Sequence, residues 1–303
     1  MTVKCSHFKN RTAVSIQSNS LKATFLPDDG AKMASLIRIR DGKELLAVKP
    51  DETYRVLTYD GDYVSSECSG FDDMFPTVDP YTPTEGAYRD ITYPDHGETC
   101  RIPYQLTVEG EEIVLRAHSR LFPITYQKRI TIEGDAITIS YRIENQGEAP
   151  FDFLWAGHMM LQGEDGMELI TPFGEDAPIE MMFAPEEVDP TSLSKHRLTG
   201  FVPQHGAAYK FYYTDRMRQG RFGVKYPDGS RLLFEVDERK LPYLGIWMNN
   251  GSFQDIYTVT PEPCTVPFDA PDRAAKRGIT SVIAPQEHFS FEIKITVKED
   301  QNI

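Results

Sequence analysis

Short runs in which apolar and polar residues alternate cover most of the chain. In residues 136–145, Ile137, Ile139, Tyr141 and Ile143 share one face and polar side chains occupy the other. This two-residue period is typical of a β-strand with one buried face. Comparable runs predict further strands at residues 13–17, 21–26, 32–39, 44–48, 105–108, 113–119, 125–132, 151–160, 208–213, 220–226, 231–236, 277–283 and 288–297.

Turn-forming residues separate these runs. Asp-Gly pairs at 41–42 and 228–229 stand between apolar runs, and this is a strong hairpin signal. No long window has a helical period, and no repeat of fixed length occurs. Residues 1–303 are therefore predicted to form one all-β domain with mainly antiparallel sheets.

Two long stretches lack this alternation. Residues 50–101 are rich in Asp, Glu, Pro, Gly, Tyr and Ser, and residues 172–203 are polar and rich in proline. Long irregular stretches inside a compact domain are more often functional loops than linkers. We expect the first to be a functional loop region and the second an excursion with at most a short helical turn.

Residues 242–250 and 255–264 predict two neighbouring strands separated by an Asn-Asn-Gly-Ser turn. Trp247, Asn249 and Glu262 lie at or near the ends of these strands. An indole can cover the C–H face of a sugar, an amide matches hydroxyl groups, and a carboxylate can move a proton. The pattern equally allows Trp247 to be a core residue and Glu262 a solvated strand end.

The net charge of the chain limits the kinds of molecule that it can bind. The formal net charge is −14 and the pI is about 5.0, so the protein repels nucleic acid and anionic membrane surfaces. The first residues have no apolar run long enough for a signal peptide and no window approaches a membrane span, so we expect a cytoplasmic protein. The four cysteines lie far apart without a CxxC pair, and we expect them to be reduced thiols.

Two of the seven histidines differ in context from the rest. His96 lies in the loop region between an aspartate and a Gly-Glu pair. His158 follows Trp155-Ala-Gly on an apolar strand, where a polar ring must find a partner or face a cavity. A histidine satisfied within the core is the alternative for His158, and Trp155 is expected to be a core residue.

Five short motifs in a fixed order resemble the aldose 1-epimerase family, the galactose mutarotase-like proteins. They span residues 23–297 and read, in order, as the loop Asp95-His96-Gly97-Glu98, the strand Trp155-x-x-His158, the strand Tyr243-Leu244-Gly245-x-Trp247, the pair Glu262-Pro263, and the closing Ala284-Pro285-x-Glu287 with Ile293.

The resemblance implies a β-supersandwich in which long loops surround a cleft on a concave sheet, with no metal and no organic cofactor. It implies that His158 is the general acid, Glu262 the general base and His96 a sugar ligand. For the family's substrate-holding aspartate and arginine, Asp72, Asp73 and Arg101 are candidates.

The sequence also departs from the best-known members. The segments around the two histidines read Asp95-His96-Gly97-Glu98 and Gly157-His158-Met159-Met160, and resemble instead a divergent, aldose epimerase-like branch. These departures leave the acid/base pair intact but put the sugar specificity in doubt.

Three functions remain open at this point. The leading one is an isomerase that interconverts the α and β anomers of a free sugar. The second is a non-catalytic domain that binds or senses carbohydrate. The third, an epimerase for hexose phosphates, is weaker because such a site needs clustered Arg or Lys. The one dense basic run, Arg216, Arg218 and Arg221, is typical of a solvated hairpin end. In each case the partner is a small sugar. A homodimer stays open, since aromatic loop residues can line the cleft or meet a second subunit.

Overall fold

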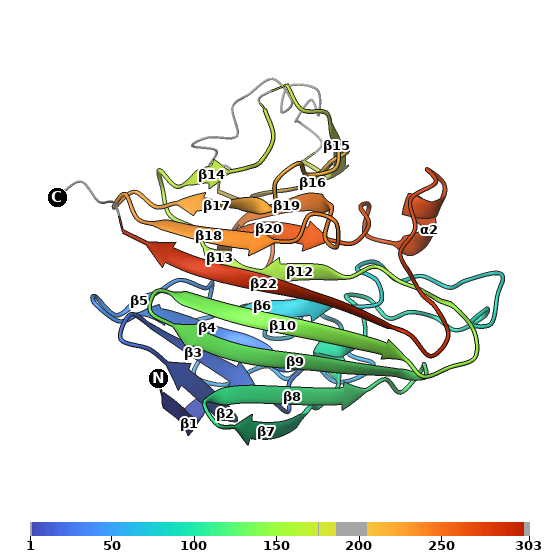
Figure 1. Cartoon of the computed structure of the whole chain (residues 1–303). Coiled ribbons are helices and arrows are strands. Elements are labelled where there is room, and N and C mark those ends of the chain that lie inside the picture. Colours follow the sequence, from blue (N-terminus) through green and yellow to red (C-terminus); the bar gives the residue numbers. More distant parts are fainter. Residues whose placement is uncertain (1, 175, 186–204, 300–303) are drawn as a thin grey trace.

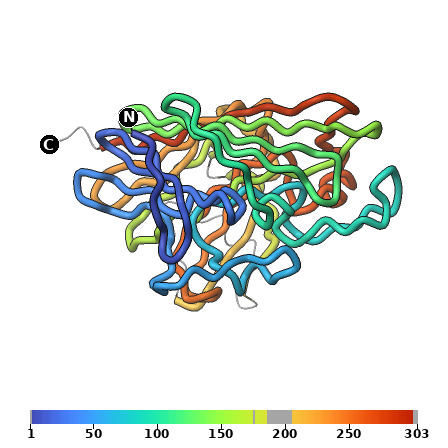
Figure 2. The backbone as a smooth tube through the Cα atoms, turned by 90° about the horizontal axis from the view of Figure 1, so that it is seen from below, coloured from blue at the N-terminus to red at the C-terminus, as the bar shows by residue number. Residues whose placement is uncertain are grey.

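In the computed structural model, which describes residues 2–174, 176–185 and 205–299, two large antiparallel sheets pack face to face (Figure 1). Among the described residues, the first sheet has twelve strands and the second has eight. Figure 2 shows the sheets as two layers and residues 50–70 on the side of the molecule away from the eight-stranded sheet. The all-β prediction is confirmed.

The twelve-stranded sheet runs in the order β1 (Thr2–Phe8), β2 (Arg11–Gln17), β3 (Leu21–Leu26), β4 (Lys32–Arg38), β6 (Phe71–Met74), β12 (Ala156–Met159), β20 (Tyr257–Cys264), β19 (Tyr243–Asn250), β16 (Ala207–Tyr213) and β15 (Ile179–Phe183), with β5 (Lys43–Glu44) on β4 and β13 (Leu161–Gln162) on β20. The two strands predicted around the Asn-Asn-Gly-Ser turn are β19 and β20, and they pair with each other from Tyr243 opposite Cys264 to Asn250 opposite Tyr257.

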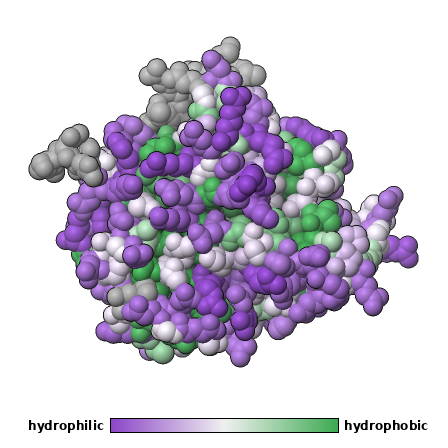
Figure 3. All heavy atoms as spheres, in the orientation of Figure 1, coloured by the Kyte–Doolittle hydropathy of each residue, from purple (hydrophilic) through white to green (hydrophobic). Residues whose placement is uncertain are grey.

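The eight-stranded sheet runs in the order β14 (Glu168–Ile170), β17 (Arg221–Lys225), β18 (Arg231–Val236), β22 (His288–Lys298), β10 (Ala136–Asn145), β9 (Ile124–Glu133), β8 (Glu112–His118) and β7 (Gln105–Glu109). Its residues are buried and partly exposed in turn along β9 and β10. The outer face of this sheet is mostly hydrophilic, with small separate apolar areas (Figure 3). Among the described residues, no helix is both long enough and apolar enough to cross a membrane.

Several local predictions were wrong. The irregular stretch 50–101 contains the central strand β6 and the short 3-10 helix η1 (Thr99–Arg101). Residues 175 and 186–203 of the predicted excursion 172–203 lie outside the described residues, and the described part contains β15. Strand β1 was not predicted, and α2 (Pro271–Ala275) is a five-residue helix. Of the strand predicted at 277–283, only β21 (Val282–Ile283) forms, and it pairs with β11 (Phe151–Asp152). The single strand predicted at 151–160 is divided into β11 and β12, and only Lys43–Glu44 is regular near 44–48.

The twelve-stranded sheet has an apolar cluster on each face. Successive side chains of a strand point to opposite faces. Phe211 of β16 and Ile246 of β19 therefore belong to the main core between the sheets, while Tyr212 and Tyr243 belong to a second cluster under the loops. Trp155 is fully buried in the main core, where its indole N–H donates to the Tyr126 hydroxyl over 2.6 Å. The outer face of the twelve-stranded sheet, beneath the loops, is where the pocket described below lies.

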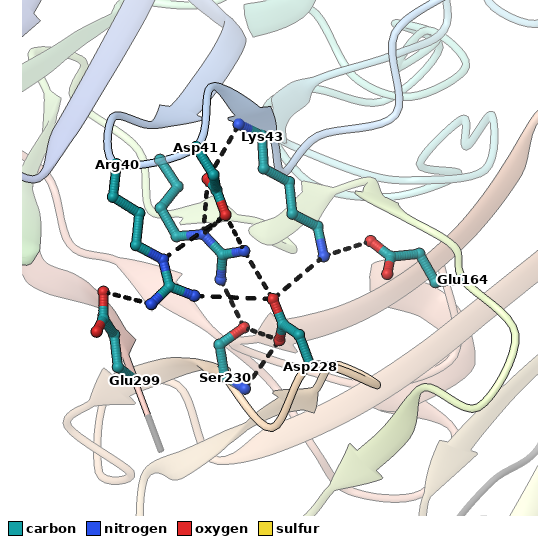
Figure 4. Close-up of polar contacts among 8 residues, drawn as sticks. Arg40, Asp41, Lys43, Glu164, Asp228, Ser230 and Glu299 are labelled. Atoms are coloured by element: carbon teal, nitrogen blue, oxygen red, sulfur yellow. Dashed lines mark hydrogen bonds and ion pairs between the residues drawn. The ribbon is translucent and has the colours of Figure 1, made fainter. Parts of the chain in front are cut away.

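An ion network joins the two sheets at a distance from that pocket. Arg38 of β4 donates to Asp41 and to Asp228, and Asp228 belongs to the turn between β17 and β18 (Figure 4). Arg40 pairs with Glu299, and Lys43 pairs with Glu164. The Arg38 side chain is only 4% exposed. The network therefore holds the β17–β18 turn of the eight-stranded sheet against the β4–β5 hairpin of the twelve-stranded sheet.

Strand β6 carries two buried aspartates that are neutralised from other strands. Asp73 lies 2.5 Å from the Lys128 ammonium of β9 and accepts a hydrogen bond of 2.9 Å from the Tyr141 hydroxyl. Asp72 lies 2.8 Å from Lys32 of β4 and accepts from the Tyr63 hydroxyl over 2.9 Å. The Asp73 contacts cross from one sheet to the other and therefore hold the sandwich together.

Replacing Lys128 by methionine is expected to lower the free energy of unfolding by about 3 kcal/mol, because it leaves the Asp73 carboxylate buried without its counter-charge. Urea denaturation of the variant and the wild-type protein measures this. Lys276→Met is the matched control, since it removes an exposed pair with Asp272 and exposed pairs contribute little. Equal losses in the two variants would contradict the role assigned to the Asp73–Lys128 pair.

Candidate active site

A cavity of about 510 Å³ opens on the outer face of the twelve-stranded sheet. Strands β12, β16 and β19 form its floor through His158, Lys210, Trp247 and Asn249. The loop residues Tyr63, His96 and Asp269 contribute polar atoms at its sides. The remaining wall is mostly apolar and consists of Val64, Cys68, Met74, Val78, Met160, Met182, Phe183, Phe253 and Ile256, with Asp79 and Arg273 completing the lining.

The two residues expected to be catalytic, His158 and Glu262, are in direct contact. His158 Nδ1 lies 2.8 Å from Glu262 Oε1. The contact follows from the pairing of β12 with β20, in which Ala156 is opposite Cys264 and the next residues on the same face are His158 and Glu262. The two groups therefore lie side by side under the pocket, and not on opposite sides of it.

Lys210 of β16 is the second partner of Glu262. Its ammonium contacts Glu262 Oε2 and lies 3.4 Å from Asp269 Oδ1. Asp269 also accepts a hydrogen bond of 2.6 Å from the Tyr212 hydroxyl. The Tyr212 ring lies over Gly245 of β19, where an added Cβ would approach it to 2.7 Å. Glycine at this position gives the ring the space it needs.

These contacts determine the charges of the site. Burial by itself would raise the pKa of Glu262, but the Lys210 charge and the His158 hydrogen bond outweigh it and lower the pKa to about 2. Burial opposes the charge of Lys210 too, yet Asp269 and Glu262 raise the pKa of Lys210 above its ordinary value. Burial lowers the pKa of His158 by more than the hydrogen bond to Glu262 raises it. At neutral pH the site therefore holds a carboxylate, an ammonium and a neutral imidazole.

His96 is the second imidazole of the pocket. Its ring stacks on Tyr63 with centroids 3.9 Å apart and planes at 9°, and lies edge-on to His158 at 6.2 Å. Nδ1 of His96 lies 2.9 Å from an Asp95 carboxylate oxygen. Because the Tyr63 hydroxyl is bound to Asp72, the buried Lys32–Asp72 pair fixes the tyrosine that supports His96.

The loop around His96 is fixed by the residues that follow it. Gly97 has a φ of +76°, and a Cβ there would collide with the backbone of Phe75. The buried Glu98 carboxylate accepts from the Tyr59 hydroxyl and the Arg120 amide, each over 2.7 Å. The Asp-His-Gly-Glu motif is thus a rigid loop that presents the imidazole to the pocket.

Two predicted substrate ligands are placed elsewhere. The Arg101 guanidinium donates to backbone carbonyls of Tyr59, Gly61, Asp95 and Gly97. It holds the loop that carries His96 and does not line the pocket. Asp73 lies between the sheets with Lys128 and Tyr141. Both side chains are buried and bound to protein groups, and neither is among the residues that line the pocket.

Trp247 and Asn249 do line the pocket, in different ways. Trp247 is half-buried and tilts against Phe253 with centroids 5.4 Å apart. The Asn249 amide donates to the carbonyls of Phe253 and Ile256 and accepts from the Phe253 amide. Asn249 therefore orders the turn between β19 and β20, while the indole face of Trp247 forms part of the wall.

Sequence reasoning did not identify Lys210 or Asp269. The available signal was a lysine inside the apolar and aromatic run of β16, Ala207–Tyr213. The arginines considered for a phosphate, Arg216, Arg218 and Arg221, are not among the lining residues, and the lining Arg273 pairs with Asp79 over 2.6 Å. No group of three or more His, Cys, Asp or Glu side chains within the described part of the chain is arranged to hold a metal ion.

The fold is that of the galactose mutarotase-like proteins. The chain is similar over 98% of its length to the whole of the Slr1438 protein from Synechocystis sp. PCC 6803, with a TM-score of 0.71 and 16% identity. It is similar over 99% of its length to 99% of a galactose mutarotase-like protein from Clostridium acetobutylicum, with a TM-score of 0.69 and 12% identity.

A candidate aldose 1-epimerase from Escherichia coli K12 matches over 95% of this chain and 99% of its own, with a TM-score of 0.69 and 13% identity. No protein-family model matches the sequence, and no curated protein does. At these identities the likeness shows the fold, and the resemblance noted from the order of the motifs is in agreement with it.

Proposed function

We propose that this protein is an aldose 1-epimerase-like isomerase that interconverts the α and β anomers of a free sugar. The observation that carries the proposal is the buried His158–Glu262 pair beneath a pocket in a galactose mutarotase-like fold. A volume of about 510 Å³ is of the size that ligand pockets have. The apolar wall with Trp247 suits the C–H face of a sugar ring.

Anomer exchange opens and closes the sugar ring with the help of proton transfers. A proton leaves the anomeric hydroxyl, the bond from C1 to the ring oxygen breaks, and the ring oxygen gains a proton. Rotation about the C1–C2 bond and ring closure then give the other anomer. Imidazole is suited to this work because it gains and loses a proton near neutral pH. In this proposal His158 exchanges protons with the sugar, Glu262 supports it, and His96 holds a hydroxyl group.

The test is proton exchange NMR on a panel of unphosphorylated aldoses with and without the protein. We expect faster exchange between the α and β anomers for at least one aldose, because each positioned proton-transfer group typically contributes a factor of about 10²–10⁴. Heat-denatured protein and a sugar whose anomeric hydroxyl is methylated are the controls.

A sugar-binding domain without activity is the second candidate. It is supported by Glu262, which is fully buried and has both oxygens in contact with protein groups. Broadened sugar signals together with an unaltered exchange rate would contradict the isomerase and favour the binding domain. A phosphorylated sugar is not favoured, because the lining arginine is already paired with Asp79.

A further inference from the structure

Glu262 has no direct access to the pocket. Its side chain is fully buried, and it is not among the residues that line the cavity. His158 and Lys210, which contact its two oxygens, are 8% and 10% exposed and both line the cavity. A sugar in the pocket therefore meets the His158 imidazole and the Lys210 ammonium, while the Glu262 carboxylate lies behind them.

The hydrogen bond to Glu262 determines which nitrogen of His158 can react. An ionised carboxylate only accepts hydrogen bonds, so Nδ1 of His158 carries the ring proton. In the neutral imidazole the other nitrogen, Nε2, then has the free lone pair. His158 is thus arranged to accept a proton first, as a general base.

The ammonium of Lys210 contacts the same carboxylate, Glu262, as this base does. It has three N–H donors, and its contacts with Glu262 and Asp269 use at most two of them. Burial opposes its charge, but Asp269 and Glu262 raise the pKa of Lys210 above its ordinary value and keep it protonated. An alkoxide is a stronger base than an amine, so even this ammonium can give a proton to an oxygen on which negative charge develops.

We propose that Lys210 is a catalytic residue of this isomerase: it gives a proton to the ring oxygen of the sugar while His158 Nε2 takes one from the anomeric hydroxyl, and Glu262 positions both. The C1–O5 bond breaks with its electron pair going to O5, and the C1–O1 bond becomes a carbonyl. Ring closure returns both protons. This inference rests on the proposed function.

The charge around Glu262 supports this assignment. Before ring opening the carboxylate faces a charged Lys210 and a neutral His158. Afterwards it faces a neutral Lys210 and a charged His158. The Glu262 carboxylate therefore has one cationic partner in both states. That constancy matters for Glu262 because its side chain is fully buried, and an unpaired buried charge is costly.

The decisive experiment is chemical rescue of Lys210→Ala, measured by anomer exchange NMR with the sugar that the wild-type protein accelerates. We expect a loss of about 10²–10⁴-fold in rate with retained sugar binding, as for other proton donors. Methylammonium should restore part of the rate in proportion to its concentration. Tetramethylammonium carries the same charge without an N–H donor and should restore none.

Several results would overturn the role of Lys210. One is a rate close to wild type in Lys210→Ala, and another is equal rescue by both ammonium ions. If the alanine variant does not fold, Lys210→Gln replaces it, since glutamine can hydrogen-bond Glu262 but cannot release a proton. A wild-type rate in that variant would equally overturn the proposal. Lys128→Met is the control for the loss of a buried lysine away from the pocket, and it should stay active.

The failure of the proposed function gives a different pattern. If the wild-type protein accelerates no aldose of the panel, the isomerase and the role of Lys210 both fall. If the wild-type protein is active and only the lysine variants behave otherwise than expected, the isomerase stands and the role of Lys210 alone is overturned.

Discussion

Replacing His158 by asparagine is expected to slow anomer exchange by about 10²–10⁴-fold, because the variant loses the group that takes a proton from the sugar. Asparagine is smaller than histidine and its amide can still donate to Glu262. We therefore expect the fold and the neighbouring Lys210–Glu262 contact to persist. The measurement is the exchange rate at saturating sugar, accompanied by a thermal unfolding curve.

The matched control is His118→Asn. His118 is exposed on β8 of the eight-stranded sheet, where its ring contacts Thr125. This variant should exchange anomers at the wild-type rate. If His158→Asn is as active as His118→Asn while remaining folded, His158 is not the proton acceptor and the proposed site is wrong.

The alternating strands could be predicted closely from the sequence. The bounds predicted for Leu21–Leu26, Ala136–Asn145 and Arg231–Val236 are those of β3, β10 and β18. Each of these strands has a regular alternation or a clear turn beside it. Local pattern is sufficient where one face of a strand is wet, because the period of two then appears directly in the residue types.

Strand β6 shows where local pattern fails. Its residues Phe71–Met74 include two adjacent aspartates, and aspartate is depleted in strands. The strand forms because Lys32 and Lys128, from β4 and β9, neutralise the two carboxylates. Those lysines are far away in the sequence, so nothing within the segment itself predicts a buried strand.

Some residues of the site could be predicted from local pattern and others could not. His96, His158, Trp247 and Glu262 were singled out from motifs of a few residues, and the structure brings the first three to one pocket with Glu262 behind His158. Lys210 was missed because a lysine on a strand is usually read as solvent-exposed. Its burial depends on Glu262, which is 52 residues away, and only the pairing of β16, β19 and β20 brings the two together.

Arg101 illustrates the opposite error. A positively charged residue in a functional loop is a reasonable candidate for a substrate ligand. In the structure its guanidinium instead satisfies carbonyl groups of the loop that carries His96. Buried carbonyls need donors, and such a requirement of the backbone cannot be seen before the path of the loop is known.

Replacing Glu262 by glutamine is expected to reduce the exchange rate by about 10²-fold or more, because the imidazolium formed on His158 loses the carboxylate that stabilises it. The same change should alter the pH dependence. In the wild-type protein the rate requires a neutral His158, whose pKa lies below its ordinary value of 6.5. The rate should therefore stay level at neutral pH and fall as the pH drops through that lowered pKa.

Four groups face His158 and determine where this fall occurs: Glu262 of β20, Lys210 of β16, and His96 and Tyr63 from the loops. Glu262 raises the pKa of His158, whereas burial, Lys210 and His96 lower it. In Glu262→Gln the raising contribution is lost and the lowering ones remain. The acidic limb of the pH–rate profile should consequently move to lower pH in the variant.

Exchange rates measured from acidic to neutral pH in both proteins test this shift. Glu292→Gln is the matched control, because Glu292 is exposed on β22 of the eight-stranded sheet and accepts a hydrogen bond from Ser140. An acidic limb at the same pH in Glu262→Gln and wild type would show that His158 is not the group that titrates. A limb that moves to higher pH would show that Glu262 does not stabilise the charged imidazole, since removing a stabilising carboxylate can only favour the neutral ring.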